Sequence, residues 1–162
     1  MKSRILIALA CISLFGIGCK SKIAADYSET ITKKENSLAP QIEETRKKLV
    51  KYFALSDYDS VSSISGQMEA RVDSLLLQIK NKPAPKVPEA ENFKQASIRY
   101  LTYLKNMYEI YKNYGSQTSA QGRMIVQDEM VTINSQEEVM SDYLKNAQQN
   151  FAKANGFKVK RK

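Results

Sequence analysis

The sequence contains no histidine and no tryptophan, and only two of its 162 residues are cysteines. Without histidine, the chain lacks the side chain that most often serves as a general base or as a zinc ligand. It also lacks the G-x-x-x-x-G-K-[ST] and G-x-G-x-x-G patterns of phosphate-binding loops and the G-x-S-x-G pattern of serine hydrolases. We therefore expect a protein that is not an enzyme and that holds no cofactor and no metal ion.

Long apolar runs are scarce, and the longest lies near the N-terminus. The segment from Ile5 to Phe15 follows the basic residues Lys2 and Arg4 and is too short to span a membrane as a stable helix. Small residues then lead into a cysteine, in the order Gly16-Ile17-Gly18-Cys19. This pattern resembles a bacterial lipoprotein signal, in which residues 1–18 are cleaved off and the new N-terminal Cys19 receives the lipid.

Cys19 sets the expected location of the protein. The other cysteine, Cys11, lies inside the signal segment, so the mature chain cannot form an internal disulfide. Two or three acyl chains on Cys19 would hold the protein stably on a membrane. In enteric bacteria, an aspartate after the lipid-bearing cysteine retains a lipoprotein in the inner membrane, whereas lysine follows Cys19 here. We therefore expect a protein of the cell envelope that is anchored in the outer membrane, in either leaflet. An ordinary secretory signal or an uncleaved anchor is the alternative.

The positive charge is concentrated at the two ends of the chain. The formal net charge is +8, but two of the basic residues lie in the signal segment and four lie in residues 158–162. The body is nearly neutral, so we expect no nucleic-acid partner. The basic tail consists of Lys158, Lys160, Arg161 and Lys162. We expect these residues to contact an anionic surface; the alternative is that the tail is simply solvated. Its terminal lysine also resembles that of the major outer-membrane lipoprotein, which implies attachment to peptidoglycan.

Apolar residues recur every three or four positions in four segments, at about residues 23–55, 57–80, 89–114 and 118–155, which predicts four amphipathic helices. Three prolines at residues 83, 85 and 88 favour an extended link between the second and third. Pro40 predicts a fresh helix start capped by Ser37, or else a kink. The fourth segment has a candidate break near residues 135–138. The pattern predicts an all-α, elongated antiparallel four-helix bundle over residues 26–157, joined to Cys19 by a tether of residues 19–25.

Several side chains on these segments have two interpretations. Tyr103 and Tyr108 are expected on the flanks of the third apolar stripe, where they form either a recognition surface or boundary packing. Glu137 falls on the fourth stripe and is either a buried acid or a salt-bridged residue. Four methionines would line an adaptable cavity or simply fill the core; they are Met68, Met107, Met130 and Met140.

Two short stretches resemble a known group of proteins. Tyr27-Ser28-Glu29-Thr30-Ile31 and the segment from Gln148 to Phe157 are similar to the opening and closing helices of a family of small helical surface lipoproteins of unknown function in Gram-negative bacteria. The resemblance implies the helical fold and the lipid anchor, and no binding residues. We therefore expect a lipid-anchored, non-enzymatic helical module that contacts an envelope protein or the cell wall. The alternative is a small-ligand or lipid binder with a cavity between its helices, and the oligomeric state stays open.

Overall fold

The computed structural model describes the backbone of residues 5–159 and the side chains of residues 20–159. This part of the chain forms six α-helices and no strand. The helices are α1 (Ile5–Asn36), α2 (Ala39–Ala54), α3 (Tyr58–Asn81), α4 (Ala90–Ser116), α5 (Ala120–Asn134) and α6 (Glu137–Ala154).

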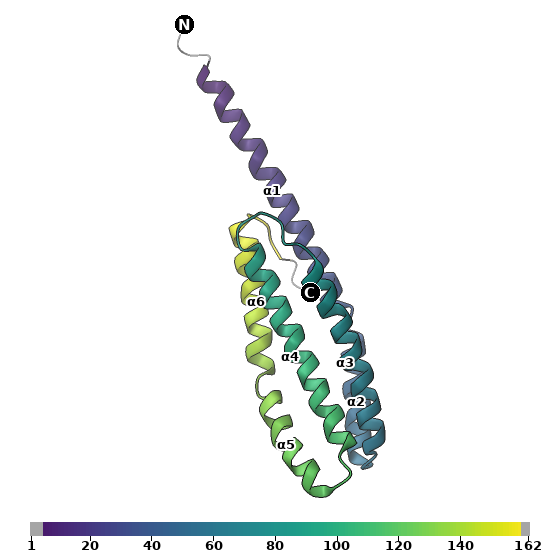
Figure 1. Ribbon diagram of the computed structural model, residues 1–162. Coiled ribbons are helices and arrows are strands. Elements are labelled where there is room, and N and C mark those ends of the chain that lie inside the picture. Colours follow the sequence, from purple (N-terminus) through teal and green to yellow (C-terminus); the bar gives the residue numbers. More distant parts are fainter. Residues whose placement is uncertain (1–4, 160–162) are drawn as a thin grey trace.

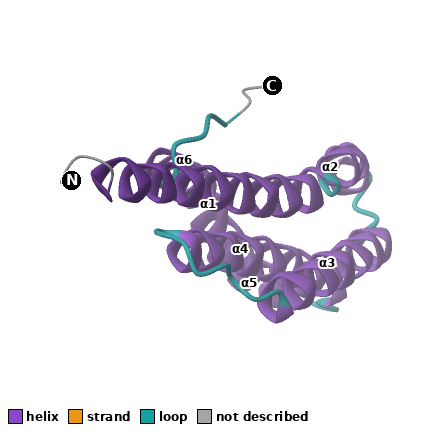
Figure 2. Ribbon diagram, turned by 90° about the horizontal axis from the view of Figure 1, so that it is seen from above, coloured by secondary structure: helices purple, strands orange, loops and turns teal. Residues whose placement is uncertain are grey.

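The six helices form four antiparallel rods. In Figure 1, α1 and α2 run in succession toward one end, α3 returns, α4 descends, and α5 and α6 climb back together. Figure 2 shows the rod of α1 and α2 lying along one side, with α3 and α4 beside each other. The expected all-α, elongated, antiparallel four-helix bundle is confirmed, with its first and last rods each broken into two helices.

The break in the first rod follows from local chemistry. Ser37 and Leu38 form a turn after α1, and Pro40 lies in the first turn of α2, where its missing N–H costs no helical hydrogen bond. The expectation that Ser37 caps the new helix is wrong. Its hydroxyl donates to the carbonyl oxygen of Lys34 at 2.6 Å, and Leu38 is the residue at the cap position.

The segment predicted as a tether is helical where its structure is described. Residues 20–25 continue α1 without a break, and Ala24 is fully buried in the core. No glycine or proline interrupts this stretch. Ala24, Tyr27 and Ile31 follow one another at spacings of three and four, so one face of α1 packs from Ala24 onward. The bundle therefore begins before residue 26.

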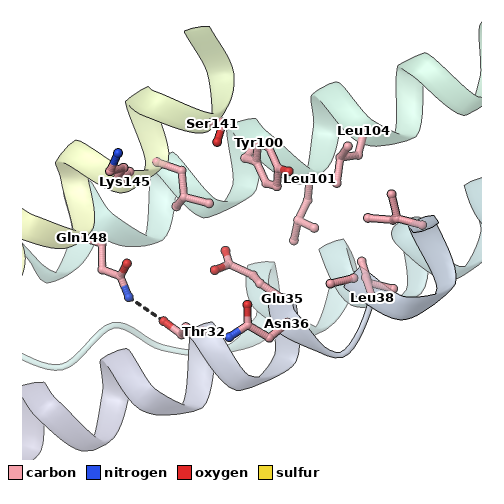
Figure 3. Close-up of a pocket in the computed structure, with 13 residues that line it drawn as sticks. Thr32, Glu35, Asn36, Leu38, Tyr100, Leu101, Leu104, Ser141, Lys145 and Gln148 are labelled. Carbon is pink, nitrogen blue, oxygen red and sulfur yellow. Dashed lines mark hydrogen bonds between the residues drawn. The ribbon is translucent and has the colours of Figure 1, made fainter. Parts of the chain in front are cut away.

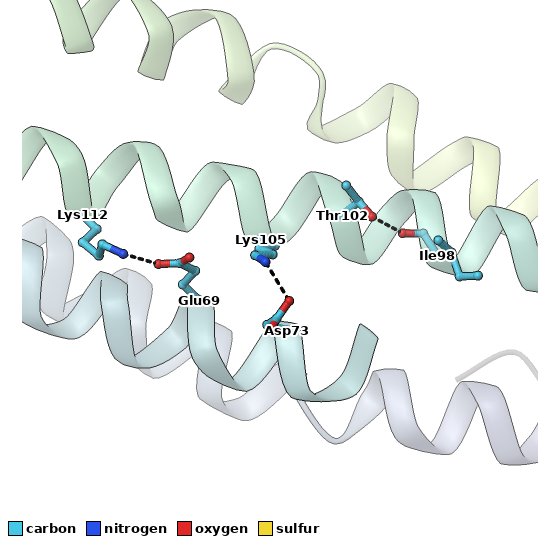
Figure 4. A network of polar contacts seen from close by, with 6 residues as sticks. All are labelled: Glu69, Asp73, Ile98, Thr102, Lys105 and Lys112. Carbon is cyan, nitrogen blue, oxygen red and sulfur yellow. Dashed lines mark hydrogen bonds and ion pairs between the residues drawn. The ribbon is translucent and has the colours of Figure 1, made fainter. Parts of the chain in front are cut away.

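Helices α3 and α4 are the most extensively packed pair. Gly115 is buried where the two backbones lie close together, because a Cβ at this position would lie 2.4 Å from the Ser62 nitrogen and 2.5 Å from the Tyr58 oxygen. Two ion pairs cross between the same helices, Lys105 Nζ to Asp73 Oδ1 at 2.7 Å and Lys112 Nζ to Glu69 Oε2 at 2.8 Å (Figure 4). The helices approach backbone to backbone at Gly115, and two partly buried ion pairs join them elsewhere along the contact.

An aromatic cluster closes the end of the bundle at which α6 ends. Phe151 of α6 stacks on Phe93 of α4 with ring centroids 5.4 Å apart, and Tyr27 of α1 meets both rings edge-on. Phe157, after α6, packs edge-on against Phe151. The Asn155 side-chain amide donates to the Pro88 carbonyl oxygen, which ties the proline-rich link to this end. The cluster thus joins three of the four rods.

Candidate functional site

A pocket of about 260 Å³ lies between α1, α4 and α6, beside the turn that separates α1 from α2. Its apolar walls consist of Leu38, Ile42, Leu101, Leu104 and Leu144. The polar groups that line it include Thr32, Glu35, Tyr100, Lys145 and Gln148 (Figure 3). We call it the Glu35 pocket. The turn after α1 interrupts the regular packing of the first rod, and the pocket lies at this interruption.

Glu35 is the unusual group in the pocket. Its carboxyl group points into the space between α1 and α4 (Figure 3), and its Oε1 atom is buried with no hydrogen-bond partner among the described residues. Burial raises the pKa of Glu35 from 4.5 to about 7, and the Ser97 hydroxyl opposes this shift in part. At neutral pH the pocket therefore holds a carboxyl group close to its titration midpoint.

Sequence reasoning missed Glu35, although a signal was present. Ile31 and Leu38 lie seven residues apart on the buried face of α1 and its following turn. Position 35 lies one helical turn from each, so it shares their face. An acidic residue between two apolar residues on the same helix face predicts a buried carboxyl group.

The rim of the pocket is polar. Gln148 Nε2 donates to Thr32 Oγ1 at 2.7 Å and so bridges α6 to α1. Lys145 of α6 is mostly exposed, with its Nζ 3.9 Å from Asp142 Oδ1. In Figure 3 the Lys145 ammonium group is directed away from Glu35. The pocket thus combines one half-buried acid with an aromatic ring and aliphatic walls.

The raised pKa of Glu35 predicts a pH-dependent stability. A folded-state pKa above the unfolded value means that the folded protein binds the proton more tightly, so stability is highest below about pH 4.5 and is lost as pH rises through 7. Between pH 5 and pH 8 we expect the free energy of unfolding to fall by about 2 kcal/mol more in the wild type than in Glu35→Gln. Urea denaturation of both proteins at each pH measures this difference. Parallel pH profiles would contradict it.

Tyr103 and Tyr108 do not form a recognition surface. Tyr103 is 5% exposed and Tyr108 is 0% exposed, so both belong to the core. The Tyr103 hydroxyl lies 3.8 Å from the Met107 sulfur. Helix α4 is in contact with α3, α5 and α6, so the flanks of its apolar stripe are covered as well as its centre. Of the two interpretations, packing is therefore confirmed, and both tyrosines lie in the core rather than at its boundary.

Glu137 is a salt-bridged residue, as one of its two interpretations stated. It is the first residue of α6, and its carboxylate accepts a hydrogen bond from the Arg46 guanidinium of α2. Both side chains are almost half exposed. The position also suits a negative charge because the N-terminal end of a helix is electropositive. Glu137 therefore joins the first and last rods rather than forming a buried acidic site.

The remaining predicted residues lie apart from the pocket. Cys19 lies in α1, and its side chain is outside the described part of the structure, as are Lys160, Arg161 and Lys162. Lys158 is exposed. The four methionines do not line the Glu35 pocket, and Met68 and Met107 are buried in the core. The methionine-lined cavity is thus wrong for this pocket.

No group of three or more cysteine, aspartate or glutamate side chains in the described part of the chain is arranged to hold a metal ion. No helix there combines the length and the apolar character that a membrane crossing requires.

Comparisons with known proteins give no further guide to the site. No protein-family model, no curated protein and no solved structure matches this chain.

Proposed function

We propose that this chain is a lipid-anchored helical module of the bacterial envelope, located at the outer membrane, that works by contacting an envelope partner and not by catalysis. Cys19 at the end of the apolar run supports the anchor. The position of the core supports a module that lies close to its anchor, because Ala24 and Tyr27 are buried within about two helical turns of Cys19. A lipid on Cys19 would hold this end of the bundle close to the membrane.

The charges at this end agree with a membrane-facing orientation. The beginning of the packed part of α1, the link between α3 and α4 and the chain after α6 lie at the same end of the bundle (Figure 1). Exposed or half-buried lysines in these segments include Lys20, Lys22, Lys82, Lys86 and Lys158. None of these five forms an ion pair with a described residue; Lys82 instead lies over the Tyr27 ring, with 5.8 Å between Nζ and the ring centroid.

Lysines outnumber acids at this end. Asp26, Glu29, Glu89 and Glu91 are the carboxylates in the neighbouring stretches of α1 and the start of α4. The predicted tail residues Lys160, Arg161 and Lys162 would add to the positive charge. Unpaired cationic side chains attract anionic headgroups within a Debye length of the surface. The membrane is thus the first envelope component that this end of the module would contact.

Metabolic labelling with palmitate tests the anchor. We expect the full chain, expressed in a Gram-negative host, to incorporate the label and to fractionate with the outer membrane. Cys19→Ser should lose the label because no thiol remains at the cleavage site. Cys11→Ser is the matched control and should keep it, since that cysteine lies inside the signal segment. Labelling of Cys19→Ser, or its loss only in Cys11→Ser, would contradict the proposal.

A second candidate function is supported by one specific observation. The buried, unpartnered Oε1 atom of Glu35 faces a pocket with apolar walls. Five buried side-chain oxygens in the described residues lack a partner, and the Glu35 oxygen is the carboxylate among them and the one that belongs to a residue lining this pocket. A buried carboxylate oxygen without a partner calls for an explanation. A bound small molecule that satisfies this oxygen is such an explanation, so small-ligand binding is the alternative role of the module.

A further inference from the structure

We propose that the Glu35 pocket binds a small organic cation, a protonated amine on a compact apolar body, with the Glu35 carboxylate as its counter-ion. This inference rests on the second proposed function, ligand binding in the same pocket, and names the chemical class of the ligand.

The unpartnered oxygen of Glu35 determines the polar end of the ligand. Oε1 is buried with no hydrogen bond of ordinary length, and the neighbouring Ser97 hydroxyl, which lowers the pKa of Glu35 in part, supplies no charge to balance the carboxylate. An ammonium group would donate a hydrogen bond to this oxygen and would also neutralise the ionised carboxylate, which burial otherwise disfavours. A hydroxyl group would supply only the hydrogen bond. A carboxylate ligand would be repelled.

Tyr100 supports the same charge. It projects from α4 into the pocket that Glu35 enters from α1 (Figure 3). The face of an aromatic ring attracts a cation that lies within about 6 Å of its centre. Lys145 is the cationic residue among those that line the pocket, and it belongs to the rim, where Asp142 accompanies it. The interior is therefore suited to receive a positive charge.

The walls and the volume determine the apolar part. Aliphatic side chains from the α1–α2 turn, from α4 and from α6 line the pocket that the carboxyl group faces. The volume of about 260 Å³ exceeds the cavity of about 150 Å³ that accommodates benzene and falls below the range of about 300–1,000 Å³ for drug-sized ligands. A body of one ring or a short branched chain fits these limits.

Three probes of the same shape and different charge test the class. Benzylamine, benzyl alcohol and benzoate each carry one ring and one polar group. We expect calorimetric titration of the full chain at pH 7 to show benzylamine binding about tenfold more tightly than benzyl alcohol, because a charge-assisted hydrogen bond replaces a neutral one. Benzoate should show no binding.

Variants locate the site and the charge effect. Glu35→Gln should weaken benzylamine binding about tenfold and change benzyl alcohol binding less than about twofold. Glu29→Gln removes an exposed carboxylate from the same helix and should change neither. Ser141→Leu places a larger side chain at the rim of the pocket and should weaken both. Denaturation curves for each variant establish that it is folded.

The outcomes separate the two proposals. Benzyl alcohol binding as tightly as benzylamine, or Glu35→Gln leaving benzylamine binding unchanged, would overturn the cation as ligand while the pocket remains a binding site. Binding of none of the three probes would overturn both the cation and the small-ligand function. Benzylamine selectivity that disappears in Glu35→Gln and persists in Glu29→Gln would support both.

Discussion

Phe151→Ala is expected to lower the free energy of unfolding by about 4 kcal/mol. Phe151 is fully buried and contacts aromatic rings from three other parts of the chain. Truncation would remove its own burial and leave a cavity where α1, α4 and α6 meet, at the end of the bundle nearest the proposed anchor. Urea denaturation followed by far-UV circular dichroism measures the change.

The matched control for this truncation is Tyr143→Ala, which lies two turns earlier on the same helix. Tyr143 is 44% exposed, and its ring carries the Arg99 guanidinium at 4.9 Å on the surface. Its loss should cost less than about 1 kcal/mol, since little apolar area is buried there. Equal costs for the two variants would mean that the aromatic cluster does not stabilise the contact between the rods.

Gly115→Ala is the second large effect, and we expect a loss of about 3 kcal/mol. The added methyl group would lie 2.4 Å from the Ser62 nitrogen and 2.5 Å from the Tyr58 oxygen. Both atoms belong to the backbone of α3, so no side-chain rotation relieves the clash and the two helices must move apart. Thermal and urea denaturation would show lower midpoints.

Gly66→Ala is the control that separates the clash from the intrinsic effect of the substitution. Gly66 also lies inside a helix of this pair, but its new methyl group would meet only the flexible Lys112 side chain, at 3.2 Å. Because alanine favours helix over glycine by about 1 kcal/mol, this variant should be as stable as the wild type or more so. A similar loss in both variants would contradict the close approach at Gly115.

The helical segments and their breaks were predictable because they depend on local patterns. Apolar spacings of three and four identify the four rods, and Pro40 and the three prolines of the α3–α4 link mark where helices cannot continue. The break near residues 135–138 was also visible from its capping pattern. Errors at this level were small shifts, such as the cap assigned to Ser37 instead of Leu38.

Local patterns were therefore enough to predict the all-α class, the number of rods and their direction, and they also point to the candidate anchor at Cys19. Which side chains are accessible depended instead on how the helices pack against one another. Tyr103 and Tyr108 became core because α4 packs against three helices, and the salt bridge of Glu137 required Arg46, 91 residues away along the chain. Glu35 is half-buried, and its carboxyl group faces a pocket because residues of α4 and α6 lie opposite α1 there. Periodicity places a residue on a face of its own helix, whereas the number of helices that meet that face depends on long-range packing, which a local pattern does not encode.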